Sequence, residues 1–199
     1  MRIGIELNGV LRDTLKKIQQ EYEKWFINNP FRDENEEDNF QYEVLSDLTS
    51  LDIMNHLKFK NEDELYDFLY KEHTMEIFGH AGSVEPSGLL DLNEFYLDMR
   101  DKHDIIVVSD EIGKSKPASL FFISKFGCLV ESVKFYSEST INSLWDSVDI
   151  LLTANPKLLL SHPKNKIVIK FNTTYNNDVE SEFNISSLKE LKTKIQEII

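Results

Sequence analysis

Two polar side chains of the kinds that perform chemistry lie at the end of the first apolar run of the chain. The run spans residues 3–7 and carries Glu6, and Asn8 follows before Gly9. A carboxylate can act as a nucleophile, a metal ligand or a general base, whereas an amide cannot transfer a proton. Since Asn-Gly is a turn signal, both side chains are expected where a strand gives way to a loop. Ligands of open α/β sheets bind at that edge.

A second apolar run ends in a similar way. It covers residues 104–109 and is followed by a turn that contains a glycine, before the next helical pattern. The polar side chains at its end and in the turn are Ser109, Asp110, Glu111, Lys114 and Lys116. Because parallel strands end at one edge of a sheet, this group is expected beside Glu6 and Asn8.

The elements that must position these residues alternate along the chain. Apolar runs predict three further strands, and apolar residues at helical spacing predict helices between them. The expected strands after the second are 132–136, 149–153 and 166–171. The expected helices are 13–29, 46–76, 89–102, 119–126 and one that begins at 186 or 187, with a short helix or turn at 139–144. Such alternation predicts an α/β fold with a parallel, doubly wound, Rossmann-like sheet of five strands.

Composition limits the class of protein. The 199 residues suffice for one domain with a sizeable insertion, and the net charge is −13. That charge argues against a nucleic-acid polymer or an anionic membrane surface as partner. One cysteine, Cys128, indicates a reducing compartment. We find no signal peptide and no membrane-length apolar run, so a cytoplasmic location is expected.

The first fourteen residues resemble the first motif of the haloacid dehalogenase (HAD) superfamily, hhhhDxDGVLxDT. The residues that match this pattern are Gly9, Val10, Leu11, Asp13 and Thr14. The motif has aspartates where this chain has Glu6 and Asn8. The resemblance extends over nearly the whole chain and is strongest to the 5′(3′)-deoxyribonucleotidases. It implies a core domain of residues 1–14 and 79–199, with residues 15–78 as a small helical cap of the C1 type.

The resemblance also implies roles for the other polar residues. Ser109 stands at the serine or threonine that binds phosphate in the second motif. Lys116 is the first choice for the lysine of the third motif, and Lys114 is the second choice. The fourth motif has two adjacent aspartates that hold Mg²⁺, and these positions fall on Thr153 and Ala154. No metal is therefore expected, unless Asp110 and Glu111 form an unconventional site.

These departures fall on the reactive half of the site. Glu6 adds one methylene to the nucleophile, and a misplacement of about 1 Å can slow a reaction ~100-fold. Asn8 cannot transfer a proton, which removes help worth roughly 10²- to 10⁴-fold. Neither Thr153 nor Ala154 supplies a carboxylate for Mg²⁺. The pattern therefore predicts a catalytically degenerate HAD-like protein.

Three hypotheses for function remain open from the sequence. In the first, the protein is a binding module that retains a pocket for a nucleotide or another small molecule bearing phosphate. In the second, it is an active, Mg²⁺-dependent nucleotidase or phosphatase with a rearranged site. In the third, it is a structural protein that binds a protein partner and whose pocket is empty. The first and third differ in whether Ser109 and Lys116 bind phosphate. The composition is compatible with a bacterial or phage origin.

Overall fold

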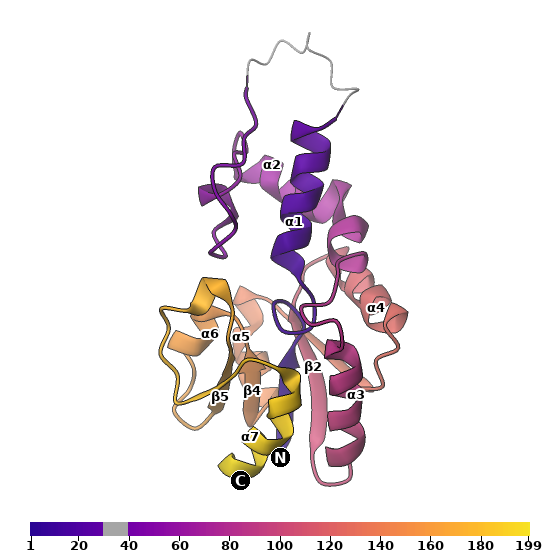
Figure 1. Ribbon diagram of the computed structural model, residues 1–199, viewed down its shortest axis with the longest axis vertical. Coiled ribbons are helices and arrows are strands. Elements are labelled where there is room, and N and C mark those ends of the chain that lie inside the picture. The colour runs from indigo at the N-terminus through magenta and orange to yellow at the C-terminus, as the bar shows by residue number, and fades with distance from the viewer. Residues whose placement is uncertain (30–39) are drawn as a thin grey trace.

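The computed structural model describes residues 1–29 and 40–199, and its centre is a parallel sheet (Figure 1). Six strands pair in the order β3-β2-β1-β4-β5-β6. Their bounds are β1 Arg2–Glu6, β2 Asp104–Asp110, β3 Ser132–Tyr136, β4 Ile150–Thr153, β5 Ile167–Phe171 and β6 Phe183–Ile185. The doubly wound, Rossmann-like fold is thus confirmed. The prediction of five strands is wrong, because β6 has only three residues, one of them the polar Asn184, and is too short to give an apolar run.

The order of the strands determines where a binding site can form. The chain first builds outward from β1 through β2 to β3, and then crosses to the opposite side of β1 to form β4. This reversal leaves a crevice at the carboxyl ends of β1 and β4, which is where ligands bind in doubly wound sheets. In the register of these strands Ile5 pairs with Leu152, so Glu6 and Thr153 follow at the same level.

Helices cover both faces of the sheet, because its strands are apolar on both sides. The helices α3 Gly88–Met99, α4 Ser115–Lys125 and α7 Leu191–Ile198 pack on one face, and α5 Ile141–Ser147 and α6 Pro156–Leu160 pack on the other. Gly127 ends α4 with a φ of 64°, as expected for the glycine after a helix. No helix in the described part of the chain is long and apolar enough to cross a bilayer.

A separate group of helices lies beyond the carboxyl edge of the sheet, at one end of the molecule (Figure 1). We call its described part, residues 13–29 and 40–79, the helical segment. It contains α1 Thr14–Tyr22, α2 Glu62–Asp67, the π-helical turns Glu23–Ile27, Phe68–Glu72 and Met75–Gly79, and a 3-10 turn at Ile53–Asn55. Its own apolar core includes Tyr22, Phe59 and Phe68.

The helical predictions for this segment are partly correct. Asp13 caps α1, and Asn61 caps α2 by accepting a hydrogen bond from the Glu64 amide at 2.9 Å. A continuous helix over 46–76 is wrong, because residues 46–52 contain no helical turn. The acidic residues within 32–43 predict a solvated loop, and most of this range lies outside the described residues.

Candidate functional site

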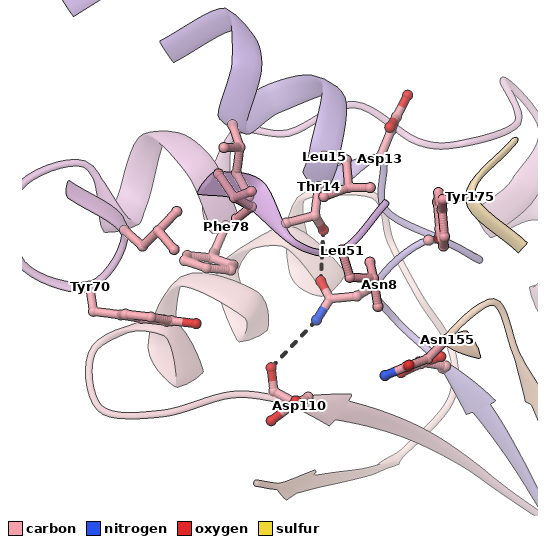
Figure 2. A pocket seen from close by; sticks show the side chains of 15 residues that line it. Asn8, Asp13, Thr14, Leu15, Leu51, Tyr70, Phe78, Asp110, Asn155 and Tyr175 are labelled. Atoms are coloured by element: carbon pink, nitrogen blue, oxygen red, sulfur yellow. Dashed lines mark hydrogen bonds between the residues drawn. The ribbon is translucent and has the colours of Figure 1, made fainter. Parts of the chain in front are cut away.

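A cavity of about 220 Å³ opens between the carboxyl edge of the sheet and the helical segment (Figure 2). The sheet side contributes polar residues, and the helical segment contributes mainly apolar and aromatic ones. The lining residues are Glu6, Asn8, Gly9, Asp13, Thr14, Leu15, Ile18, Leu51, Ile53, Leu69, Tyr70, Phe78, Asp110, Asn155 and Tyr175. The described lining includes three carboxylates and no lysine or arginine.

Glu6 ends β1 at the floor of this cavity, with 2% of its surface exposed. Its Oε1 accepts a hydrogen bond from the Tyr136 hydroxyl at 2.8 Å, and its Oε2 accepts one from the Thr153 hydroxyl. Burial raises the pKa of Glu6 to about 7, and the nearby Asp110 carboxylate acts in the same direction. The two hydroxyl donors oppose that rise without cancelling it. Glu6 is therefore a buried carboxyl that can hold a proton near neutral pH.

The Asn8 side chain lies in the cavity wall and forms hydrogen bonds with buried residues behind it. Its Oδ1 accepts hydrogen bonds from Arg12 at 2.6 Å and from the Thr14 hydroxyl at 2.7 Å. Its Nδ2 points toward the end of β2, 3.4 Å from the Ser109 hydroxyl and 3.5 Å from the Asp110 carbonyl oxygen (Figure 2). The amide therefore links the loop after β1 to the end of β2.

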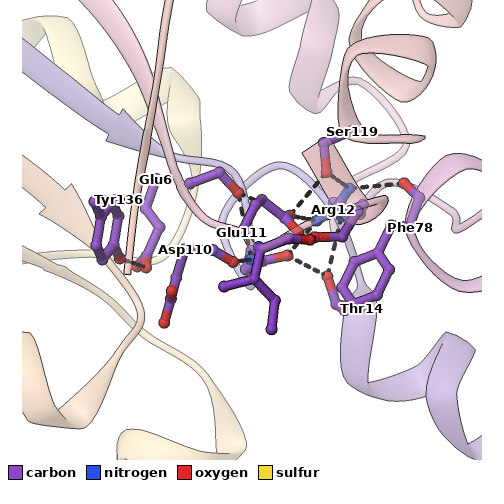
Figure 3. Close-up of polar contacts among 12 residues, drawn as sticks. Glu6, Arg12, Thr14, Phe78, Asp110, Glu111, Ser119 and Tyr136 are labelled. Atoms are coloured by element: carbon purple, nitrogen blue, oxygen red, sulfur yellow. Dashed lines mark hydrogen bonds and ion pairs between the residues drawn. The ribbon is translucent and has the colours of Figure 1, made fainter. Parts of the chain in front are cut away.

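Behind this wall lies a fully buried ion pair between Arg12 and Glu111 (Figure 3). Neither side chain has any exposed surface. Arg12 also donates to the Phe78 carbonyl oxygen at 2.7 Å and to the Ser119 hydroxyl at 2.6 Å. Burial lowers the pKa of the Arg12 guanidinium, and the Glu111 carboxylate opposes that shift.

The residues predicted to bind phosphate are separated in the structure. Ser109 is buried, and its hydroxyl donates to Glu111 Oε1 at 3.0 Å. Lys114 and Lys116 are exposed at the start of α4 and are absent from the described lining of the cavity. The predicted set of one hydroxyl and one lysine is thus not brought together around the cavity.

Asp110 and Asn155 border both this cavity and a second one of about 260 Å³. Burial, reinforced by the Glu111 and Glu138 carboxylates, raises the pKa of Asp110 to about 6. Lys157 lines the second cavity and lowers the pKa of Asp110.

The resemblance to HAD proteins implies a Mg²⁺ ion, and the described side chains do not fit one. Both Glu6 oxygens already accept hydroxyl hydrogen bonds, and Glu111 is held by Arg12. In the described ranges, no three Asp, Glu, His or Cys side chains group closely enough to hold a metal ion. Asp110 is the remaining carboxylate of the predicted fallback pair that faces the cavity.

The end of β4 packs tightly against the loop after β1. Gly9 has a φ of 76°, which favours glycine, and a Cβ built on it would lie 3.1 Å from the Ala154 Cβ and 1.8 Å from the Tyr175 hydroxyl. The side chain of Asn176 donates to the carbonyl oxygens of Ala154 and Phe171, both at 2.9 Å. Thr153 and Ala154 are fully buried, so this end of β4 is a packed part of the wall.

Sequence analysis missed three residues of this network: Arg12, Ser119 and Tyr136. Arg12 directly precedes Asp13 and Thr14 in a polar cluster that indicates the start of a helix, so the sequence gives no sign that Arg12 is buried. Its partner Glu111 is 99 positions away along the chain. Tyr136 ends β3, at the same edge of the sheet as the other candidate residues. Its position at the end of a predicted strand is the sequence feature that could have identified it as a site residue.

Comparison with known proteins supports the fold. No protein-family model matches this chain, and no curated protein sequence matches it. Among solved structures, a haloacid dehalogenase-like hydrolase from Burkholderia xenovorans LB400 matches with a TM-score of 0.60. The match covers 98% of this chain and 96% of that chain at 10% sequence identity. The chain therefore shares the HAD-like fold with that protein.

Proposed function

We propose that this chain is a catalytically degenerate protein of HAD-like fold that works by binding. In this proposal residues 1–14 and 79–199 are the core, and the range 15–78 is a cap of the C1 type, whose described part borders the cavity. One observation carries the proposal: polar groups at the strand ends are bonded to one another. Glu6 accepts hydrogen bonds from hydroxyl groups, and Asn8 accepts them from Arg12 and Thr14. The Ser109 hydroxyl donates a hydrogen bond to Glu111.

The chemistry of these groups supports the loss of catalysis. Phosphoryl transfer to a carboxylate needs an ionised nucleophile and a proton donor for the leaving group. Burial raises the pKa of Glu6 to about 7, so it is only partly ionised at neutral pH, and each of its oxygens already accepts a hydroxyl hydrogen bond. The Asn8 amide can donate hydrogen bonds but is not acidic enough to protonate a leaving group. A cavity with mainly apolar walls on the side of the helical segment remains suited to hold a small molecule.

Hydrolysis assays test this proposal. The natural chain should release no phosphate from p-nitrophenyl phosphate or a panel of deoxynucleoside monophosphates in the presence of Mg²⁺. The matched control carries Glu6→Asp, Asn8→Asp, Thr153→Asp and Ala154→Asp, which restore the acids of the family pattern. Turnover by the natural chain at an ordinary enzyme rate, about 1 s⁻¹ or more, contradicts the proposal. A gain of activity in the control alone supports it.

The alternative of an active phosphatase is favoured by one observation. Asp110 lines the same cavity as Glu6 and is close enough to raise the pKa of Glu6. If the natural chain proves active, Asp110→Asn should abolish turnover. Asp104→Asn is the matched control, because Asp104 is an exposed aspartate at the opposite end of the same strand.

A further inference from the structure

Three hydrogen-bond donors converge on one oxygen of Glu111 (Figure 3). The Ser109 hydroxyl donates to Oε1 at 3.0 Å, the Ser119 hydroxyl donates at 2.8 Å, and the Arg12 guanidinium forms the ion pair with the same oxygen. These donors come from the end of β2, from α4 and from the loop after β1. A guanidinium with two hydroxyls is a donor set that binds free carboxylates and phosphates.

The way in which Glu111 is held resembles a bound anion more than an optimised structural ion pair. All three donors meet Oε1, whereas Oε2 is buried without a hydrogen-bond partner in the described part of the chain. Ion pairs that stabilise a fold satisfy both carboxylate oxygens, because an unpaired buried oxygen is unfavourable. The donors are thus arranged around one point in space, and the Glu111 carboxylate occupies that point.

This point lies directly behind the wall of the cavity. Arg12 bonds Asn8, Thr14 and the carbonyl oxygen of Phe78, and all three of these residues line the cavity. An anionic group of a ligand that reached through this wall would meet the donors that Glu111 already occupies. It would also meet the negative charge of Glu111 itself.

We propose that Arg12, Ser109 and Ser119 form an oxyanion-binding site that the protein's own Glu111 occupies. Glu111 is then a specificity-determining residue, because it excludes phosphate and other anions from this end of the cavity. The ligand class that the cavity accepts is uncharged or cationic, which agrees with three carboxylates and no lysine or arginine in the described lining. This inference rests on the proposed binding function and restricts the class of ligand that the cavity binds.

The variant Glu111→Ala tests the site with a probe of matching size. The substitution removes one methylene and the carboxylate, which are the atoms of acetate. The melting temperature Tm of the full chain is measured in sodium acetate and in sodium chloride at equal ionic strength. Acetate should raise the Tm of Glu111→Ala by about 2–4 °C over chloride, because a ligand of the folded state stabilises it. The natural chain should show equal Tm values in both salts.

Two control variants separate a specific site from a general salt effect. Glu94→Ala removes an exposed glutamate from α3 and should show no response to acetate. Glu111→Ala combined with Arg12→Met lacks the guanidinium and should lose the response.

Two results overturn the inference. The first is a folded Glu111→Ala chain, as judged by circular dichroism, whose Tm is the same in acetate and chloride. The second is a natural chain that phosphate stabilises and whose stabilisation is lost in Ser109→Ala, which would mean that Glu111 does not exclude anions. This second measurement decides the matter even if Glu111→Ala fails to fold. Neither measurement involves turnover, so a failure of the proposed function is recognised separately in the hydrolysis assays.

Discussion

Glu6 and Glu111 are buried glutamates at the ends of neighbouring strands, and they are stabilised in different ways. Glu111 has a guanidinium beside it, so its negative charge is compensated. Glu6 has two hydroxyl donors and no cation among its described partners, and burial raises its pKa to about 7. The sheet brings both carboxyls to the same edge. Their neighbours differ: Glu111 lies beside a guanidinium, whereas Glu6 is bonded by neutral hydroxyls and can hold a proton near neutral pH.

Removing the Arg12 charge should show the difference between Glu111 and Glu6 most clearly. Arg12→Met leaves Glu111 as an uncompensated buried carboxylate, and breaking a buried pair in this way costs about 3–5 kcal/mol. The free energy of unfolding, measured in urea at pH 8, should fall by that amount. This is the largest effect that we expect from a single substitution in the site.

A double variant serves as the control for Arg12→Met. Arg12→Met combined with Glu111→Gln removes both charges, and such replacements are often neutral compared with the intact pair. The double variant should therefore be more stable than Arg12→Met alone. If Arg12→Met lowers the free energy of unfolding by less than about 1 kcal/mol, the Arg12–Glu111 ion pair contributes little to the stability of the fold.

The free energy of unfolding should depend on pH through the titration of Glu6. Its pKa is about 7 in the folded chain against 4.5 for an unperturbed glutamate, so between these pH values the folded chain holds a proton that the unfolded chain releases. The contribution of Glu6 to stability is therefore fully present below pH 4.5 and is lost as the pH rises through 7. Glu6→Gln removes this dependence. Relative to the natural chain, it should gain about 3 kcal/mol between pH 4.5 and pH 8.

Urea unfolding of both chains at several pH values measures this gain. The difference between the two profiles isolates Glu6 from the other groups that titrate in the same range. Parallel profiles would mean that the Glu6 carboxyl is ionised throughout, and that its environment resembles that of Glu111 after all.

The smallest expected effects come from single hydroxyl donors. Tyr136→Phe removes a donor from Glu6 and should lower the free energy of unfolding by about 2 kcal/mol at pH 8, where the carboxylate is charged. The loss should shrink at pH 5, where Glu6 is protonated. Ser109→Ala removes one of three donors from Glu111 and should cost about 1 kcal/mol.

The pH dependence of these two variants is the informative measurement. Ser109→Ala leaves the Arg12 guanidinium beside Glu111, so its cost at pH 5 and pH 8 is the reference for the cost of Tyr136→Phe at the same pH values. Equal pH dependence in the two variants would remove the distinction between the two carboxyls.

Much of the fold was predictable from the sequence because the strands are short, continuous apolar runs. The run Ser132–Tyr136 was predicted with its observed bounds, and Ile167–Phe171 differs by one residue. The short strand β6 escaped prediction because its three residues give no periodicity. Residues 46–52 were included in the helix predicted over 46–76, but they form an irregular segment. Their side chains are exposed or half-buried, so no buried apolar face stabilises a helix there.

The candidate site was predictable in part. Glu6 and Asn8 were placed at the cavity by the turn signal that follows β1, and both line it. The Arg12–Glu111 pair could not be predicted, because the pairing of residues 99 positions apart depends on the packing of α4 and the helical segment. The lysines near the start of α4 were chosen by position along the chain, and the structure shows them at the surface.

Arg12 has a further consequence for the topology of the chain. Its backbone pairs with Ser83, and its guanidinium holds the carbonyl oxygen of Phe78, so the start and the end of the helical segment are fastened side by side. Closing a long loop costs entropy that grows only slowly with its length. The contacts of Arg12 with Ser83 and Phe78 offset that entropy at the two ends of the segment. A change in the length of the segment between these ends should therefore leave the register of the sheet unchanged.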